Sequence, residues 1–350
     1  MTRGAAVAAS DPFAQSAAES VLASGGGAAD ALVAAFFSAA GARPDVLFAP
    51  AVALVAGHAA GIRFFDGRSL QPGRGGHRPR GFVSESEVPN AARVPVPRAV
   101  AMALLLHSYA GRARLREAIR PAIAAAQKAS APRRAELLRS IADRGLLGIR
   151  SREVTRALID VGGPLAGGTL TEEDLDELRA GEGQARELAL ENGATVITTP
   201  DTRLNADAAP FPAYPASETP VELVVACDAW QSAAALAYMP AGPGIAIEAL
   251  ELVIAPQAIP VMRSVPRRAP GTPQPMPAPI AVLHPPSGYI AAVGFPGSPS
   301  VPDAAWTGIL SAEMPFEAAL ERACAQYDFA RALAALVTAK AARAYQVRGA

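Results

Sequence analysis

Cysteine, excess charge of either sign and long apolar runs are scarce in this sequence, and each shortage excludes a class of protein. The 350 residues include two cysteines, Cys227 and Cys324, which lack metal-ligand spacing, so a reducing cytoplasm is the simplest location. Lys plus Arg total 32, as do Asp plus Glu, so the basic excess of a dedicated nucleic-acid binder is missing. The longest apolar run, 99–106, is far short of the roughly 18–20 residues of a membrane span. We therefore expect a cytoplasmic protein with neither nucleic acid nor membrane as a partner.

The motifs of several common enzyme classes are also missing. There is no phosphate-binding G-x-x-x-x-G-K-[ST] loop and no G-x-S-x-G nucleophile elbow. The histidines lie far apart and lack the i, i+4 pairing of zinc proteases: His58, His77, His107 and His284. We therefore expect no metal site and no cofactor.

Apolar residues are plentiful, which favours a large buried core. Hydrophobic residues make up 51% of the chain and charged residues 18%, a composition that argues against a mostly disordered chain. The length fits one large or two modest domains. The 30 glycines and 32 prolines lack the period of a collagen and predict many long connections.

The order of the expected elements predicts helices layered on antiparallel sheets. The apolar periodicity predicts helices over 13–24, from about 30 onward, over most of 96–180 and over 316–345. Short β-branched or apolar runs bounded by Gly and Pro predict strands over 5–9, 51–56, 62–65, 195–198, 221–225, 245–254, 280–283 and 289–293.

Several segments together resemble the γ-glutamyltransferase family. Residues 7–12 (Val-Ala-Ala-Ser-Asp-Pro) and 22–35 are similar to its V-A-A-S-H-P and L-x-x-G-G-N-A-x-D-A-x-V-A-A elements. Residues 66–72 (Asp-Gly-Arg-Ser-Leu-Gln-Pro) resemble its D-x-R-E-x-A-P element, and residues 94–95 and 100–109 resemble its A-V-P-G helix entry. Residues 167–175 are close to its G-G-x-L-T-x-E-D-L signature. The segments follow the family's order over residues 4–180, which makes the set more specific than any one of them.

The resemblance implies an α+β fold, namely the four-layer αββα sandwich of N-terminal-nucleophile hydrolases with a reduced helical region. In this family a precursor cuts itself before a threonine, whose hydroxyl then attacks γ-glutamyl amide bonds. A hydroxyl is a poor nucleophile without a neighbouring base, and the freed α-amine, with a pKa of about 7.7–8.0 in model peptides, can be that base. We accordingly expect a single domain, 1–350, with a large-subunit-like part over 1–218 and a small-subunit-like part over 219–350.

Thr219 is the candidate nucleophile, with the cut between Glu218 and Thr219. The segment 219–226 (Thr-Pro-Val-Glu-Leu-Val-Val-Ala) is similar to the family's T-T-H-[FY]-S-V-V-D strand. Pro220 replaces the second threonine and removes a backbone N–H and a hydroxyl. The alternative is a threonine that simply enters a strand.

The resemblance also assigns candidate binding groups. Arg68 matches the arginine that holds the substrate carboxylate, a role suited to a bidentate guanidinium; the alternative is an ion pair after a hairpin. Gly297 and Ser298 match the G-S-P-G-G loop whose N–H groups form an oxyanion hole; the alternative is an ordinary Pro-Gly turn. Glu248 and Glu251 are the only acids near the family's R-M-D-D position.

The departures from the family leave two functions open. The glycine-rich stretch and the paired serines of the family are absent, as is its long insert before the nucleophile, so the chain is similar to a shortened and divergent member. The first hypothesis is an amidohydrolase or acyltransferase that acts on a small-molecule amide or γ-glutamyl-type substrate. The alternative is an uncleaved, non-catalytic homologue that serves as a scaffold or binding module. An oligomer is possible in either case.

Overall fold

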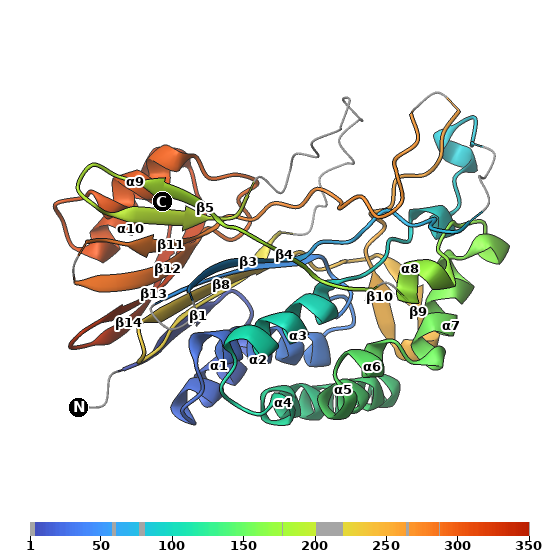
Figure 1. Cartoon of the computed structure of the whole chain (residues 1–350), viewed down its shortest axis with the longest axis horizontal. Helices are drawn as coiled ribbons and strands as arrows, with labels where there is room; N and C mark the ends of the chain where they lie inside the picture. Colours follow the sequence, from blue (N-terminus) through green and yellow to red (C-terminus); the bar gives the residue numbers. More distant parts are fainter. Residues whose placement is uncertain are drawn as a thin grey trace.

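The computed structural model describes residues 4–57, 61–76, 81–176, 178–200, 220–263, 266–286 and 288–349. These residues form four layers, in which two antiparallel sheets pack face to face and helices cover both outer faces (Figure 1). The predicted αββα sandwich is therefore confirmed.

The first sheet has six strands, and the strand that follows residue 219 is the second, next to the edge strand. The strand order is β1 (Ala6–Ala9), β7 (Glu222–Cys227), β8 (Ser232–Tyr238), β2 (Ala51–Gly57), β3 (Gly61–Gly67) and β4 (Gly181–Gly183). Every neighbouring pair is antiparallel. The hairpin expected from 51–56 and 62–65 is β2 and β3.

The second sheet also has six antiparallel strands. Their order is β14 (Ala342–Arg348), β13 (Arg331–Thr338), β12 (Tyr289–Gly294), β11 (Ile280–His284), β6 (Thr195–Thr198) and β5 (Arg186–Ala189). A separate hairpin consists of β9 (Ile245–Ile247) and β10 (Leu252–Ile254). Each large sheet combines strands from before and after residue 218, so backbone hydrogen bonds join the two parts of the chain.

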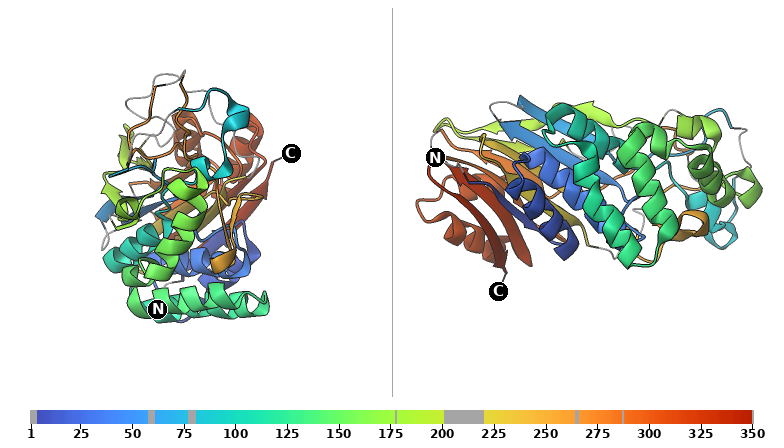
Figure 2. Two further views of the ribbon diagram at one scale, coloured as in Figure 1. Left: turned by 90° about the vertical axis from the view of Figure 1, so that its right-hand side faces the viewer. Right: turned by 90° about the horizontal axis from the view of Figure 1, so that it is seen from below.

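Helices cover the two outer faces unequally. On the first sheet lie α1 (Pro12–Ala23), α2 (Ala28–Ala42) and α3 (Ala99–Ala110), with α4 (Leu115–Lys128) and α5 (Pro132–Arg144) packed outside α2. Figure 2 shows this blue-to-green group of helices from below. The chain continues through α6 (Leu146–Ile149), α7 (Arg152–Gly162) and α8 (Glu172–Asp176). The second sheet carries α9 (Asp303–Leu310) and α10 (Phe316–Tyr327). Among the described helices, none is long and apolar enough to cross a membrane.

Three apolar cores follow from the alternation of side chains along the strands. On β7, Val224 and Ala226 face the α1–α2 layer, whereas Leu223 and Val225 face the second sheet. The third core lies between the second sheet and the α9–α10 layer and contains Phe295 and Trp306. Both faces of each central strand are buried, which explains why these strands are apolar at nearly every position.

Three predictions of secondary structure were wrong, and strands β4, β5 and β8 were not predicted. The helix expected over 316–345 ends at Tyr327, and β13 and β14 follow it. The helix expected up to residue 180 is described only over Glu172–Asp176, and 178–180 are not helical. The strand over 245–254 is two short strands around a 3₁₀ turn, Glu248–Leu250. Strand β8 was not predicted, because its sequence (Ser-Ala-Ala-Ala-Leu-Ala-Tyr) lacks β-branched residues and only tertiary packing selects a strand there.

Gly41 allows α2 and α4 to pack closely. A Cβ at this position would lie 2.1 Å from the Ala122 carbonyl oxygen on α4, which is backbone and cannot move aside. We expect Gly41→Ala to lower the free energy of unfolding by about 3 kcal/mol or more through overpacking. Gly308→Ala, in α9, is the matched control because no atom lies within 4 Å of its Cβ, and it should stabilise by about 0.5–1 kcal/mol. Urea unfolding of both variants measures the difference; equal stabilities would contradict the assigned contact.

Candidate active site

One row of paired residues brings Arg68 to the sheet edge at which β7 begins. Across the first sheet, Glu222 pairs with Tyr238, Tyr238 with Ala51, and Ala51 with Gly67. Neighbouring strands lie about 4.8 Å apart, so the three steps span roughly 14 Å. Arg68 directly follows Gly67 and therefore leaves the sheet at the same edge where Pro220 and Val221 enter β7.

The loop after β12 lies against the start of β7. The Gly297 N–H donates a hydrogen bond to the Val221 carbonyl oxygen at 3.1 Å. A Cβ built on Gly297 would be 3.8 Å from the Pro220 Cβ, and Gly297 has a φ of +78°, which favours glycine. The structure therefore brings the loop of Gly297 and Ser298 next to the segment that follows residue 219.

Thr219 and Glu218 lie outside the described residues. The nearest described neighbours are Pro220, which is exposed, and Val221, which is buried between the sheets. The nucleophile and the scissile bond accordingly stay predictions.

Both candidate oxyanion donors already donate hydrogen bonds within the chain. The Gly297 N–H is bound to Val221, and the Ser298 N–H donates to the Phe295 carbonyl oxygen at 3.1 Å. The second bond closes a four-residue turn of the kind that the sequence left open as the alternative. An oxyanion hole at this loop requires a substrate oxygen to replace these acceptors, so the hole too stays a prediction.

Arg68 is held by a carboxylate two residues earlier in the chain. Its Nε and Nη2 donate to the two Asp66 oxygens at 3.1 and 2.9 Å, and its backbone N–H donates to Oδ1 at 2.9 Å. The ion pair after the hairpin, which the sequence left open as the alternative, is therefore present. It fixes the orientation of the guanidinium at the sheet edge.

A second arginine completes this buried charge cluster. Arg98, at the start of α3, lies 3.2 Å from Asp66 Oδ1 and donates to the carbonyl oxygens of Asp66 and Arg68 at 2.9 and 3.0 Å. Burial alone raises the pKa of the Asp66 carboxyl, but the hydrogen bonds from Arg68 and the charges of both arginines outweigh burial and hold that pKa below its ordinary value. The sequence analysis did not single out Arg98, which lies 30 residues from Arg68.

The lowered pKa predicts that Asp66 loses its stabilising role in acid. A depressed pKa contributes stability above the unfolded value of about 3.9, and this contribution is lost as the pH falls through the lower folded value. Asp66→Asn should therefore be less stable than wild type at pH 7, by about 3 kcal/mol, because two buried arginines lose their partner. The deficit should shrink below pH 4. Urea unfolding at pH 7 and pH 3 measures both effects.

Asp160→Asn is the control for this prediction, since Asp160 forms an exposed pair with Arg156 at 3.9 Å. Exposed pairs contribute little, so its stability should match wild type at both pH values. An Asp66→Asn deficit that does not change with pH would contradict the lowered pKa.

The segments that resemble the family meet around Arg68 in space. Asp174 accepts hydrogen bonds from the Gly73 and Arg74 N–H groups at 2.7 and 3.1 Å, which ties the T-E-E-D segment to the loop after Arg68. Leu70 pairs with Val96 and with Pro273. The segments therefore act together to hold the chain around Arg68.

The opening motif holds the start of β7 in a similar way. The Ser10 hydroxyl accepts a hydrogen bond from the Leu223 N–H at 2.8 Å. Asp11 caps α1 through the Ala14 N–H and lies 3.3 Å from Arg43 Nη1, which also contacts Glu222 of β7 at 2.6 Å. These contacts fix the strand three residues after Thr219.

Glu248 and Glu251 lie on the helical side of the molecule. Glu251 accepts hydrogen bonds from the Arg133 and Arg134 N–H groups at 3.0 and 3.4 Å and thus caps α5. Glu248 is exposed in the 3₁₀ turn before it. Within the described chain neither carboxylate contacts Arg68, so their role toward a substrate ammonium group remains untested. In that same part of the chain no group of three or more His, Cys, Asp or Glu could hold a metal ion.

Comparison with solved structures identifies proteins of similar fold. The cephalosporin acylase from Bacillus halodurans is 13% identical, with 98% of this chain and 96% of that chain covered and a TM-score of 0.66. The γ-glutamyltranspeptidase from Pseudomonas nitroreducens, complexed with L-DON, is 24% identical over 56% of this chain and 71% of that chain, with a TM-score of 0.48. No protein-family model and no curated protein matches the sequence. The first likeness shows a shared fold over nearly the whole chain.

Proposed function

We propose that this chain is an amidohydrolase or acyltransferase with Thr219 as its nucleophile, freed by self-cleavage between Glu218 and Thr219. The observation that carries the proposal is the convergence at one sheet edge of the start of β7, the Gly297 loop and Arg68. The fold shared with a cephalosporin acylase supports it. Because a fold does not fix a function, the chemistry rests on these residues.

The proposed reaction has two steps. The Thr219 hydroxyl oxygen attacks the amide carbonyl carbon while the α-amine of Thr219 takes the hydroxyl proton. The C–N bond then breaks, and the leaving amine takes that proton. Water, or the amine of an acceptor, cleaves the acyl ester and returns the proton to the threonine oxygen. Gly297 and Ser298 are the proposed donors to the oxygen that carries the developing charge.

Arg68 is the proposed binding group for a carboxylate of the substrate. Asp66 holds its guanidinium at a fixed orientation, and Arg98 holds Asp66 and the Arg68 backbone carbonyl oxygen, which reduces the entropy lost when a ligand binds. The substrate class is a small-molecule amide or γ-glutamyl-type compound. The Glu251 carboxylate accepts a hydrogen bond from the start of α5. The ammonium group of a γ-glutamyl substrate would therefore have to compete for this carboxylate.

Cleavage is expected to leave one folded unit. Strands from 1–218 and 219–350 alternate in both sheets, so the two pieces stay joined by backbone hydrogen bonds after the cut. We also propose a cytoplasmic location, because both cysteines are free and buried.

The second candidate function is an uncleaved scaffold or binding module. Two observations favour it: the N–H groups of Gly297 and Ser298 donate to carbonyl oxygens of the chain, and the guanidinium of Arg68 pairs with Asp66. A catalytic site needs such donors to be available to the substrate. The two functions differ in whether the chain is cut and whether amides are hydrolysed.

A panel of chromogenic amides tests the activity. p-Nitroanilides of γ-glutamate, glutarate and pentanoate present an acyl group with an ammonium and a carboxylate, a carboxylate only, or neither. We expect p-nitroaniline release to be fastest with the first two, because Arg68 binds a carboxylate, and to fall below about pH 8 as the α-amine base is protonated. If the chain is cut but hydrolyses none of the three amides, the proposed substrate class is wrong.

A further inference from the structure

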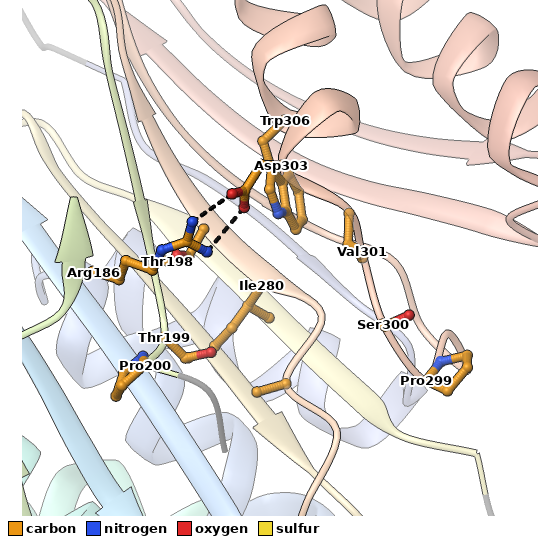
Figure 3. A pocket seen from close by; sticks show the side chains of 11 residues that line it. Arg186, Thr198, Thr199, Pro200, Ile280, Pro299, Ser300, Val301, Asp303 and Trp306 are labelled. Carbon is orange, nitrogen blue, oxygen red and sulfur yellow. Dashed lines mark hydrogen bonds and ion pairs between the residues drawn. The ribbon is translucent and has the colours of Figure 1, made fainter. Parts of the chain in front are cut away.

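A cavity of about 350 Å³ lies at the edge of the second sheet, beside the Gly297 loop. Pro299, Ser300 and Val301, which directly follow Ser298, form one wall. The ends of β6 and β11 and the first turn of α9 form the rest (Figure 3). A group bound here would lie within a few residues of the proposed oxyanion loop.

Among the described residues that line the cavity, Arg186 and Asp303 carry charge, and they form an ion pair. Arg186 of β5 donates through Nη1 to Asp303 Oδ1 at 3.0 Å and through Nη2 to Oδ2, so the pair is bidentate. A charged ligand would have to compete with this bidentate pair, whereas a neutral ligand leaves it in place; both side chains are about half exposed, so the resulting preference is modest. The lining therefore favours a neutral ligand.

The cavity also presents hydrogen-bonding groups that have no hydrogen-bond partner among the described residues. Trp306 is 3% exposed and packs against Phe295, with ring centroids 5.2 Å apart, yet its indole N–H donates to no residue in the described part of the chain. The hydroxyls of Thr199 and Ser300 likewise have no hydrogen bond to any described residue, and Figure 3 shows both on the cavity side. Ser300 is exposed and Thr199 half-exposed, and the indole N–H opens onto the cavity, so water or a ligand supplies the partner of each group.

We propose that this cavity is a substrate subsite for a neutral, hydrogen-bond-accepting group, such as a carboxamide or carbonyl on a short aliphatic chain. The acceptor oxygen binds the Trp306 N–H, the hydroxyls of Thr199 and Ser300 are further polar contacts in the cavity, and the chain packs on Ile280 and Val301. That the bound group is part of a substrate rests on the proposed function; that the cavity binds such a group does not. It makes the cavity the part of the site that selects an uncharged portion of the substrate.

Trp306 provides a direct optical probe of this cavity, because the chain has two tryptophans and Trp230 lies elsewhere, under Arg112. In a Trp230→Phe, Thr219→Ala protein, which stays uncut under the proposal, we would titrate pentanamide, pentanoate and pentylammonium while recording fluorescence. The three probes share a chain and differ in charge. Pentanamide should bind saturably, in about the millimolar range for a ligand this small, and a few-fold more tightly than either ion.

Three substitutions in this background locate the binding groups. Ser300→Ala and Thr199→Val should each weaken pentanamide binding about 2–10-fold, the effect of one lost hydrogen bond. Thr307→Val is the matched control, since Thr307 on α9 bonds its hydroxyl to the Ala304 carbonyl oxygen outside the cavity. Asp303→Asn removes the negative charge and should shift preference from pentanamide toward pentanoate.

The outcomes separate this inference from the proposed function. Saturable, amide-selective binding that both hydroxyl variants weaken supports the subsite even if the wild-type chain is never cut. Equal affinity for all three probes, no saturable change, or equal effects of Thr307→Val and Ser300→Ala would overturn the subsite and leave the proposed nucleophile unaffected.

Discussion

Thr219→Ala is expected to leave the chain whole and to abolish amide hydrolysis. The substitution removes the oxygen that attacks both the Glu218 carbonyl and the substrate, while Pro220 and the contacts of β7 stay in place. Loss of a catalytic nucleophile lowers kcat by a factor on the order of 10⁴–10⁶. Denaturing electrophoresis reports the cut, and p-nitroaniline release reports the activity.

Two further variants sharpen this expectation. Thr219→Ser keeps a hydroxyl and should still be cut, more slowly. Thr155→Ala, on α7, removes a threonine far from β7 in the sequence and should be cut like wild type. A Thr219→Ala protein that is cut, or that hydrolyses amides at the wild-type rate, would refute the assignment of the nucleophile.

Arg68→Ala has the second largest expected effect. Hydrogen bonds to a charged group contribute about 1.5–3 kcal/mol, so losing the carboxylate contact should lower kcat/KM for an acidic acyl substrate by about 10–150-fold. Most of the change should be in KM, because the contact is made in the ground state as well. The neutral pentanoyl substrate should be affected far less, and the ratio of the two substrates is the measurement.

Arg63→Ala is the control, because Arg63 lies on the same strand in an exposed pair with Glu182 at 3.2 Å. Arg68→Lys keeps a charge but loses the bidentate geometry, so it should restore part of the preference at most. If Arg68→Ala slows both substrates equally, Arg68 supports the fold around Asp66 and does not bind the carboxylate.

The resemblance of short segments predicted the fold well because those segments are structural. Asp11 caps α1, Asp174 holds the loop after Arg68, and Asp30 accepts hydrogen bonds from the Gly27 and Arg112 N–H groups. Each is a short polar residue that satisfies backbone donors at the start of an element, and this requirement persists when the rest of the sequence changes. The four layers could therefore be predicted from the sequence.

The details of the site could not be predicted in the same way. The ion pair of Arg68 after the hairpin was left open as an alternative, but its partner, Asp66, was not named although it lies only two residues earlier. Arg98, by contrast, reaches Asp66 only through the packing of α3 on β3. The cavity at Trp306 depends on how four elements meet and has no sequence signature. Alanine-rich β8 and β13 were missed because alanine has little β preference of its own.

Intact mass measurement of the freshly purified wild-type protein, under denaturing conditions, tests the central claim most directly. The account predicts two masses, those of residues 1–218 and 219–350, with Thr219 at the new amino terminus. A single mass for the uncut chain, unchanged after prolonged incubation at neutral pH, would contradict it and leave a shared fold without the threonine chemistry.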